Sequence, residues 1–252
     1  MTINVYWTRC NPGETELRIA GLDGNSMLSP LRVFAPEPLM KHMDYKEFFG
    51  PAVSRCPAIV DDLKNIFVIK SPVDLKIEVM EDHSMKVLTQ SVQFAQSFLG
   101  NPQGRMGLHQ MALGYLFIAE KSLVATQLPA YYDINSFTEN SFLISASFDV
   151  GSWFRVAGKP AFAWKPGARI VDIKEGDALM YFKFNTSEKV RLIEFDDTEH
   201  NKQGDWRFDN TCARLKHQGT GVIPLAKCYE YFHQFKLRQR ILKMAKKNIV
   251  KD

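Results

Sequence analysis

The hydrophobic residues of this chain recur at strand spacing over most of its length. Residues 73–80 show this most clearly, because apolar side chains alternate there with Asp74, Lys76 and Glu78. A period of two places apolar side chains on one face and charged ones on the other, as in a half-buried β-strand. The sequence therefore predicts a strand at 73–80.

Further short strands are predicted between turn residues such as Gly, Pro and Asp. They lie at 3–7, 66–69, 85–96, 113–119, 123–132, 141–148, 153–156, 161–164, 169–173 and 178–184. Short strands at regular spacing argue for an antiparallel sandwich or jelly-roll-like body rather than a parallel sheet. The predicted fold class is therefore mainly β. Prolines between 21 and 51 leave room for a helix only at 39–49.

The end of the chain has a helical period instead. After Pro224 the apolar residues are spaced by three, four or seven: Leu225, Cys228, Phe232, Phe235, Leu242 and Ile249. This spacing predicts an amphipathic helix that docks on the β body. We divide the chain into a β-rich body, residues 1–223, and a C-terminal basic amphipathic helix, residues 224–252. A loop signal at 101–104 is a candidate internal boundary of the body.

The charge of the chain is concentrated in that C-terminal helix. Its 29 residues hold eight Lys or Arg and two acids, which gives a local charge of +6. Because the whole chain has a net charge of +4, residues 1–223 sum to −2. A near-neutral body with a basic tail suggests binding to an acidic protein partner, self-assembly, or nucleic acid through the helix. The candidate partner-binding residues are Lys236, Arg238, Lys243, Lys246 and Lys247. The alternative is that these side chains are solvated while the apolar stripe docks.

The composition excludes several classes of protein. Apolar residues make up 45% and charged residues 24%, which is a globular mixture rather than a disordered one. The sequence has no apolar run long enough for a membrane span and no signal peptide at its start. Four widely spaced cysteines then read as reduced thiols. We expect a protein that is not exported.

One motif suggests a metal site. His42-x-Asp44 has the form of the first two ligands in the facial triad of Fe(II) oxygenases, with His109, His200 or His217 as the third. The alternative is a solvated loop. Two Cys-x4-His pairs (Cys212 with His217, Cys228 with His233) and the acidic turns at 81–83 and 194–200 are expected to be inert.

Familiar catalytic motifs are missing from the sequence. It contains no Gly-x-Ser-x-Gly elbow, no Gly-x-Gly-x-x-Gly fingerprint and no phosphate-binding P-loop. We therefore predict a non-catalytic protein without a cofactor. The alternatives that stay open are a jelly-roll Fe(II) oxygenase and a diverged nucleotide hydrolase.

Cys56-Pro57-Ala58 with residues 65–74, and later residues 148–184 with their Trp, Pro-Gly and Gly-Asp turns, resemble one family pattern. The family consists of uncharacterised proteins of bacteria and tailed phages, notably marine ones. The two segments cover about half of the chain. The resemblance implies a phage-encoded binding or assembly protein, in the virion or in the cytoplasm of the infected host, and no particular chemistry.

Residues 148–184 are also distantly similar to the trimeric dUTP nucleotidohydrolases, whose late strands close on a turn like Gly176-Asp177. The Pro-Arg-Ser-Gly phosphate motif and the Gly-Val-Ile-Asp uracil hairpin of those enzymes are absent. Residues 148–151 resemble the hairpin motif only faintly. The similarity implies β-topology and not the catalysis.

Overall fold

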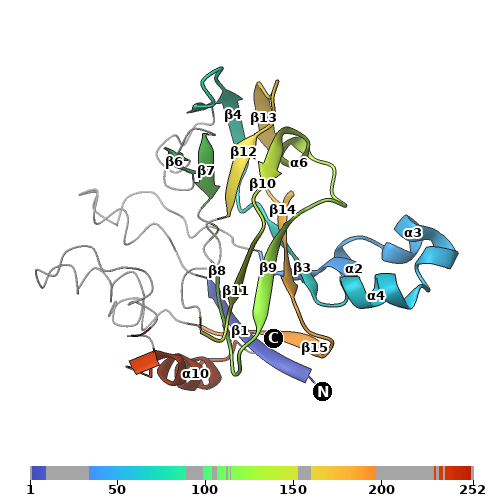
Figure 1. Cartoon of the computed structure of the whole chain (residues 1–252), viewed down its shortest axis with the longest axis vertical. Coiled ribbons are helices and arrows are strands. Elements are labelled where there is room, and N and C mark those ends of the chain that lie inside the picture. The colour runs from blue at the N-terminus through green and yellow to red at the C-terminus, as the bar shows by residue number, and fades with distance from the viewer. Residues whose placement is uncertain are drawn as a thin grey trace, which may run out of the picture.

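The computed structural model of the protein describes residues 2–9, 34–88, 99–103, 107–111, 113, 115–152, 160–196, 230, 233–234 and 236–250. Over these residues the protein is mainly β, with several antiparallel sheets and a helix near the C-terminus (Figure 1). The predicted fold class is confirmed. None of the described helices is long and apolar enough to cross a membrane.

A five-stranded sheet forms the centre of the molecule and carries the candidate site. Its order is β11-β9-β14-β3-β2, and every neighbouring pair is antiparallel. The strands are β2 (Glu37–Pro38), β3 (Ile66–Lys70), β9 (Val124–Pro129), β11 (Ala146–Asp149) and β14 (Ala178–Phe184).

Both faces of this sheet are covered, as β3 illustrates. Phe67 and Ile69 belong to the main hydrophobic core, whereas Ile66 and Val68 belong to a second cluster with residues of the neighbouring helices. Consecutive side chains of a strand point to opposite faces, so a strand covered on both faces is apolar at every position. This is why residues 66–69 form a continuous apolar run.

Three smaller sheets complete the described β body, with the orders β15-β1-β8, β10-β12-β7-β6 and β13-β4-β5. The β1–β15 pair is parallel, and the other pairs are antiparallel. Their strands are β1 (Thr2–Arg9), β4 (Leu75–Val79), β5 (Met85–Val87), β6 (Leu99–Gln103), β7 (Leu108–Met111), β8 (Tyr115–Ala119), β10 (Ser141–Leu143), β12 (Ala161–Trp164), β13 (Ile170–Ile173) and β15 (Lys189–Glu194).

The main core joins all four sheets. Phe117 of β8 stacks on Phe182 of β14 with ring centroids 4.7 Å apart. The same cluster of buried residues includes Ile77 of β4 and Phe162 of β12. Its members lie on both sides of residues 101–104 in the sequence.

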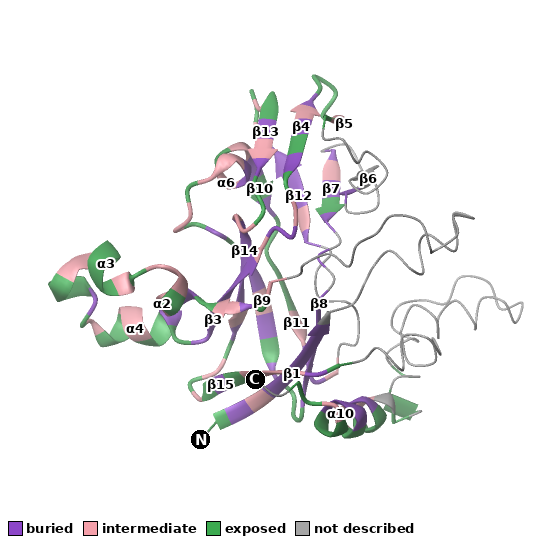
Figure 2. Cartoon of the chain, turned by 180° about the vertical axis from the view of Figure 1, so that it is seen from behind, coloured by how far each residue is buried: buried purple, intermediate pink, exposed green. Residues whose placement is uncertain are grey.

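Three helices stand out from one side of the sheets in both views (Figures 1 and 2): α2 (Leu39–His42), α3 (Tyr45–Val53) and α4 (Pro57–Leu63). The sequence predicted one helix at 39–49. Two helices form because Met43 is extended and Asp44 then begins α3, accepting hydrogen bonds from the amides of Lys46 and Glu47. Proline in its first turn suits α4.

Helix α10 (Leu237–Lys247) lies against β8, away from the three helices (Figure 1). Its buried residues are Ile241, Met244 and Ala245. The predicted stripe was therefore wrong in register, because Leu242 is half-buried and Ile249 is exposed. The other predicted stripe residues, and Pro224, lie outside the described residues.

Other predictions need correction. Residues 101–103, expected to be a loop, belong to β6, where the pairing with β7 shifts register between Gly100 and Gln103. A proline is tolerated there because β6 is an edge strand. The predicted strand at 141–148 divides into β10 and β11, which belong to different sheets, and β15 was not predicted. The predicted strand at 153–156 lies outside the described residues.

Candidate binding site

The candidate site lies where one strand path leaves the central sheet. Within residues 141–149, strand β10 pairs with β12 and strand β11 pairs with β9. The change falls at Ile144, which would lie opposite Pro129 if the pairing with β9 continued. Proline has no amide hydrogen to donate, and the amide of Ile144 donates instead to the carbonyl of Ala161, at 2.8 Å. The two strands diverge there.

A short helix fills part of the space between the diverging strands. It is α6 (Ser136–Asn140), and Asn135 caps it by accepting hydrogen bonds from the amides of Phe137 and Thr138. Thr138 completes a capping box, because its hydroxyl oxygen accepts from the amide of Asn135. Ser141 closes the other end by donating to the carbonyl of Phe137.

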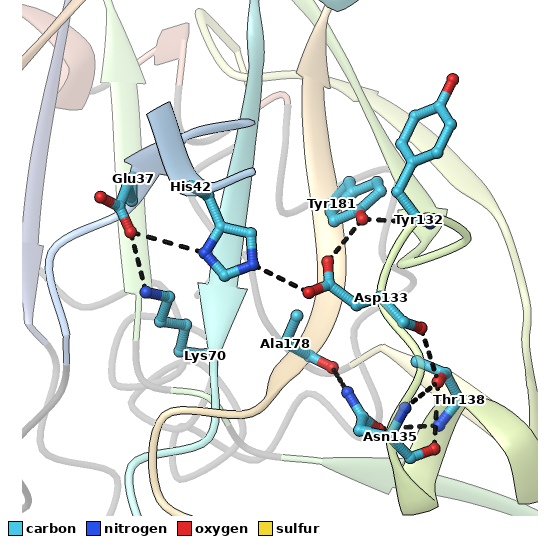
Figure 3. A network of polar contacts seen from close by, with 9 residues as sticks. All are labelled: Glu37, His42, Lys70, Tyr132, Asp133, Asn135, Thr138, Ala178 and Tyr181. Atoms are coloured by element: carbon cyan, nitrogen blue, oxygen red, sulfur yellow. Dashed lines mark hydrogen bonds and ion pairs between the residues drawn. The ribbon is translucent and has the colours of Figure 1, made fainter. Parts of the chain in front are cut away.

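The loop that leads into α6 is held by a polar network (Figure 3). His42 of α2 places Nε2 2.8 Å from Oδ1 of Asp133. The hydroxyl of Tyr181, from β14, donates to Oδ2 of the same carboxylate at 2.5 Å. On the other side, Nδ1 of His42 lies 3.6 Å from Glu37, whose carboxylate accepts from Lys70 at 2.8 Å. Both ring nitrogens of His42 therefore face a carboxylate.

The network shifts the protonation of its members. The hydrogen bond with Asp133 raises the pKa of His42 and outweighs the effect of burial. Burial raises the pKa of Asp133, but the hydrogen bonds from His42 and Tyr181 together hold it below its ordinary value. The hydrogen bond from Lys70 lowers the pKa of Glu37. Burial and the Asp133 contact raise the pKa of the Tyr181 hydroxyl. The charged pair and a neutral phenol are thus the favoured forms.

Aromatic rings fix the same loop from the apolar side. Tyr132 contacts Phe48 and Phe49 of α3, with ring centroids 5.6 and 5.4 Å away. Tyr131 and Tyr132 both pack on Tyr181 of β14. The loop after β9 therefore joins the three helices to the central sheet.

The opposite side of this loop forms a cavity of about 470 Å³, which we call the fork pocket. Its lining residues are Pro129, Ala130, Tyr131, Asp133, Ile134, Phe137, Thr138, Glu139, Ser141, Phe142, Leu143, Lys165 and Leu179. Three of its apolar residues reach into solvent: Ile134 is 86% exposed, Phe142 54% and Tyr131 49%. Side chains of this kind gathered at one cavity mark a binding surface.

Lys165 closes one side of the fork pocket. Its ammonium group donates to the carbonyl of Thr138 at 2.9 Å and lies 5.3 Å from the centre of the Phe142 ring. The polar groups of the pocket are thus mostly held by the protein itself, as those of Asp133 are by His42 and Tyr181. The pocket offers apolar contact and shape.

The predicted iron ligands do not come together. Nε2 of His42 bonds Asp133, and Asp44 caps α3. His109 lies in β7, where its Nε2 contacts the carbonyl of His83. Among the described residues no group of three His, Cys, Asp or Glu side chains could hold a metal ion. His42, Asp44 and His109, the ligands of the alternative interpretation, thus each have a different partner in the described structure. His200 and His217 lie outside the described residues.

The predicted basic surface on α10 is divided in two. Lys246 forms an ion pair with Glu120, and Arg238 donates to the carbonyl of the same residue, so these two cations contact the turn between β8 and β9. Lys236, Lys243 and Lys247 are exposed.

Residues 148–151, which resemble the uracil hairpin faintly, have a role in the fold. Asp149 accepts hydrogen bonds from Ser122, Leu123 and Gly151.

Sequence reasoning missed the residues of the fork pocket and of the network. Pro129 was the available signal, because a proline inside a predicted strand marks the point where pairing changes. The distance of 91 residues between His42 and Asp133 gives no such signal.

Comparison of the chain with models of protein families, with curated proteins and with solved structures finds no match.

Proposed function

We propose that the protein is a non-catalytic binding or assembly protein that takes an apolar group of a protein partner in the fork pocket. The observation that carries the proposal is the gathering of Ile134, Phe142 and Tyr131, all about half exposed or more, around one cavity. A side chain of this size contributes about 1.5–3 kcal/mol when it is fully buried. A partner that covers all three would gain enough to bind.

The rigid support of the loop favours binding over catalysis. Asp133 is held on two sides by His42 and Tyr181, and Tyr132 is packed between the helices and the sheet. A loop fixed in this way loses little conformational freedom when it binds. The exposed cations Lys236, Lys243 and Lys247 would add a salt-dependent attraction to an acidic partner or to nucleic acid.

The phage setting is part of the proposal. The two segments that resemble the phage family are neighbours in the fold, since β3 of the first segment pairs with β14 of the second. We propose that the protein acts in the infected host cytoplasm or in the particle. Mass spectrometry of purified particles and of infected cells would separate these locations.

The pocket is tested with a displayed library of random peptides selected on the immobilised full chain. We expect peptides with an apolar residue to bind the wild type, and to lose binding in the Ile134→Lys variant. Ile170→Lys is the matched control, because Ile170 is a 47% exposed isoleucine outside the fork pocket. Selected peptides that bind Ile134→Lys as well as the wild type would overturn the proposal. So would stoichiometric iron that His42→Ala removes.

A further inference from the structure

Among the described residues, the segment from β10 to β11 forms one open edge. β10 is the last strand of its sheet and β11 the last strand of the central sheet. The register pairs Phe142 with Ala163. The amide of Ile144 donates to the carbonyl of Ala161, and the backbone amide of Lys165 donates to the carbonyl of Asn140. Hydrogen-bonded residues alternate along an antiparallel pair, so the backbone groups of Ser141 and Leu143 point away from β12.

The same side stays open along β11. The carbonyl of Val124 accepts from Asn185, which turns Val124 toward β14. By alternation, Gln127 faces β11 and bonds Ala146. The backbone groups of Ser147 then point away from β9. Within the described part of the chain, no strand pairs with this edge, and residues 144–147 are exposed.

This edge lacks the features that keep strand edges apart. Residues 141–148 (Ser-Phe-Leu-Ile-Ser-Ala-Ser-Phe) contain no charge, no proline and no glycine. The charged residue of β11, Asp149, is its last residue and accepts hydrogen bonds from Ser122, Leu123 and Gly151. Edge strands are commonly protected by charged residues or proline. The other described edges follow that rule, with Pro38 in β2, Lys86 in β5, Pro102 in β6, Asp172 in β13 and Lys189 in β15, or are buried, as β8 is.

We propose that this edge pairs antiparallel with the same edge of a second copy of the chain, about a twofold axis at Ile144. The pairing goes beyond the fork pocket, since Ile144, Ser145 and Ser147 do not line it. This inference rests on the proposed assembly function and makes it more specific, because it names a second copy of the chain as the partner. The sequence of the edge is complementary to itself in this register.

Side-chain size supports the register. With the axis at Ile144, Phe142 lies opposite Ala146 of the second copy, and Ile144 lies opposite Ile144. Phe142 thus meets a small residue, and the two Ile144 side chains meet each other at the axis, on the exposed face where Phe142 is 54% and Ile144 44% exposed. The outward backbone groups of Ser141 meet those of Ser147, and those of Leu143 meet those of Ser145. No charged residues oppose each other between 141 and 147, and a twofold contact closes after two copies.

The test is sedimentation of the full chain at increasing concentration. We expect a dimer for the wild type, and a dissociation constant raised about a hundredfold or more in Ile144→Lys, because two like charges then meet at the axis. Ile144→Asp should be monomeric for the same reason. A mixture of the two variants should form a mixed dimer, since Lys and Asp meet at the axis.

The controls separate this pairing from binding in the pocket. Ile134→Lys should stay dimeric although its pocket is blocked, and Ile144→Lys should still bind the selected peptides. Circular dichroism of each variant checks that it is folded. A monomeric wild type, a dimer that Ile144→Lys leaves intact, open-ended oligomers, or variants that do not form a mixed dimer would each overturn the proposal.

Discussion

At the scale of single residues, His42 connects protonation to stability. Its folded-state pKa is raised, so the stabilisation it contributes is complete below its ordinary value of about 6.5 and is lost as the pH rises through the folded value. Asp133 and Glu37 have lowered pKa values. Their contribution is present above about pH 4 and is lost as the pH falls through their folded values. The network is therefore strongest between these limits.

Replacing His42 by Leu should remove the alkaline limb of this dependence. We expect the free energy of unfolding to fall by about 1–3 kcal/mol near pH 6, because Asp133 then stays partly buried without its strongest partner. Urea denaturation across the pH range measures this. Lys41→Leu, at an exposed position beside His42, should keep the alkaline limb, because Lys41 pairs with Glu37 and not with Asp133. A His42→Leu variant that still loses stability above pH 6.5 as the wild type does would refute the assignment.

Gly151 tests a close approach of two turns. A Cβ atom at this position would lie 2.3 Å from the carbonyl oxygen of Lys121, which is backbone and has no room to rotate away. Gly151→Ala should therefore destabilise the protein by about 1–3 kcal/mol, the usual cost of forced overpacking. Thermal denaturation gives the value. Ser152→Ala, next in the chain, should change little because its hydroxyl contact with Asp149 is long, at 3.3 Å.

At the scale of elements, periodicity predicted the positions of strands better than it predicted which strands pair with each other. The alternation at 73–80 identified β4, and its buried residues Leu75, Ile77 and Val79 are the predicted apolar face. The sequence did not indicate that β10 and β11 belong to different sheets, since pairing depends on Pro129 and Ala161 far away in the chain. α6 was missed because five residues are too few to show a helical period.

Helix α10 allows the corrected stripe to be tested. Ile241 is 1% exposed, so Ile241→Ala should lower the free energy of unfolding by about 2–4 kcal/mol through lost burial and the cavity left behind. Leu242→Ala should cost clearly less, since Leu242 is only half-buried. Replacing Lys243 and Lys247 by Gln should change stability by less than about 0.5 kcal/mol. A larger loss for Leu242 than for Ile241 would favour the register expected from the sequence.

At the scale of the whole molecule, composition and turn spacing were enough for the fold class but not for the site. Aromatic residues and short strands indicated a β body, and they form its core. The fork pocket depends on residues from β9, α6, β10 and β14, and on Lys165, that meet only after folding. Asp133 looked like an ordinary turn residue, because the partners that define its role, His42 and Tyr181, lie 91 and 48 positions away.

The continuous core predicts that the described sheets unfold together. Phe182 contacts Phe117, Phe148 and Phe184, and its cluster includes residues of all four sheets. Phe182→Ala should cost about 3–5 kcal/mol. Because the lost contacts link several sheets, the loss should shift a single transition rather than split it. Far-ultraviolet circular dichroism, which follows the strands, and near-ultraviolet dichroism, which follows aromatic packing, should give the same midpoint in urea for the wild type and the variant. Midpoints that separate in the wild type would mean that part of the β body unfolds by itself.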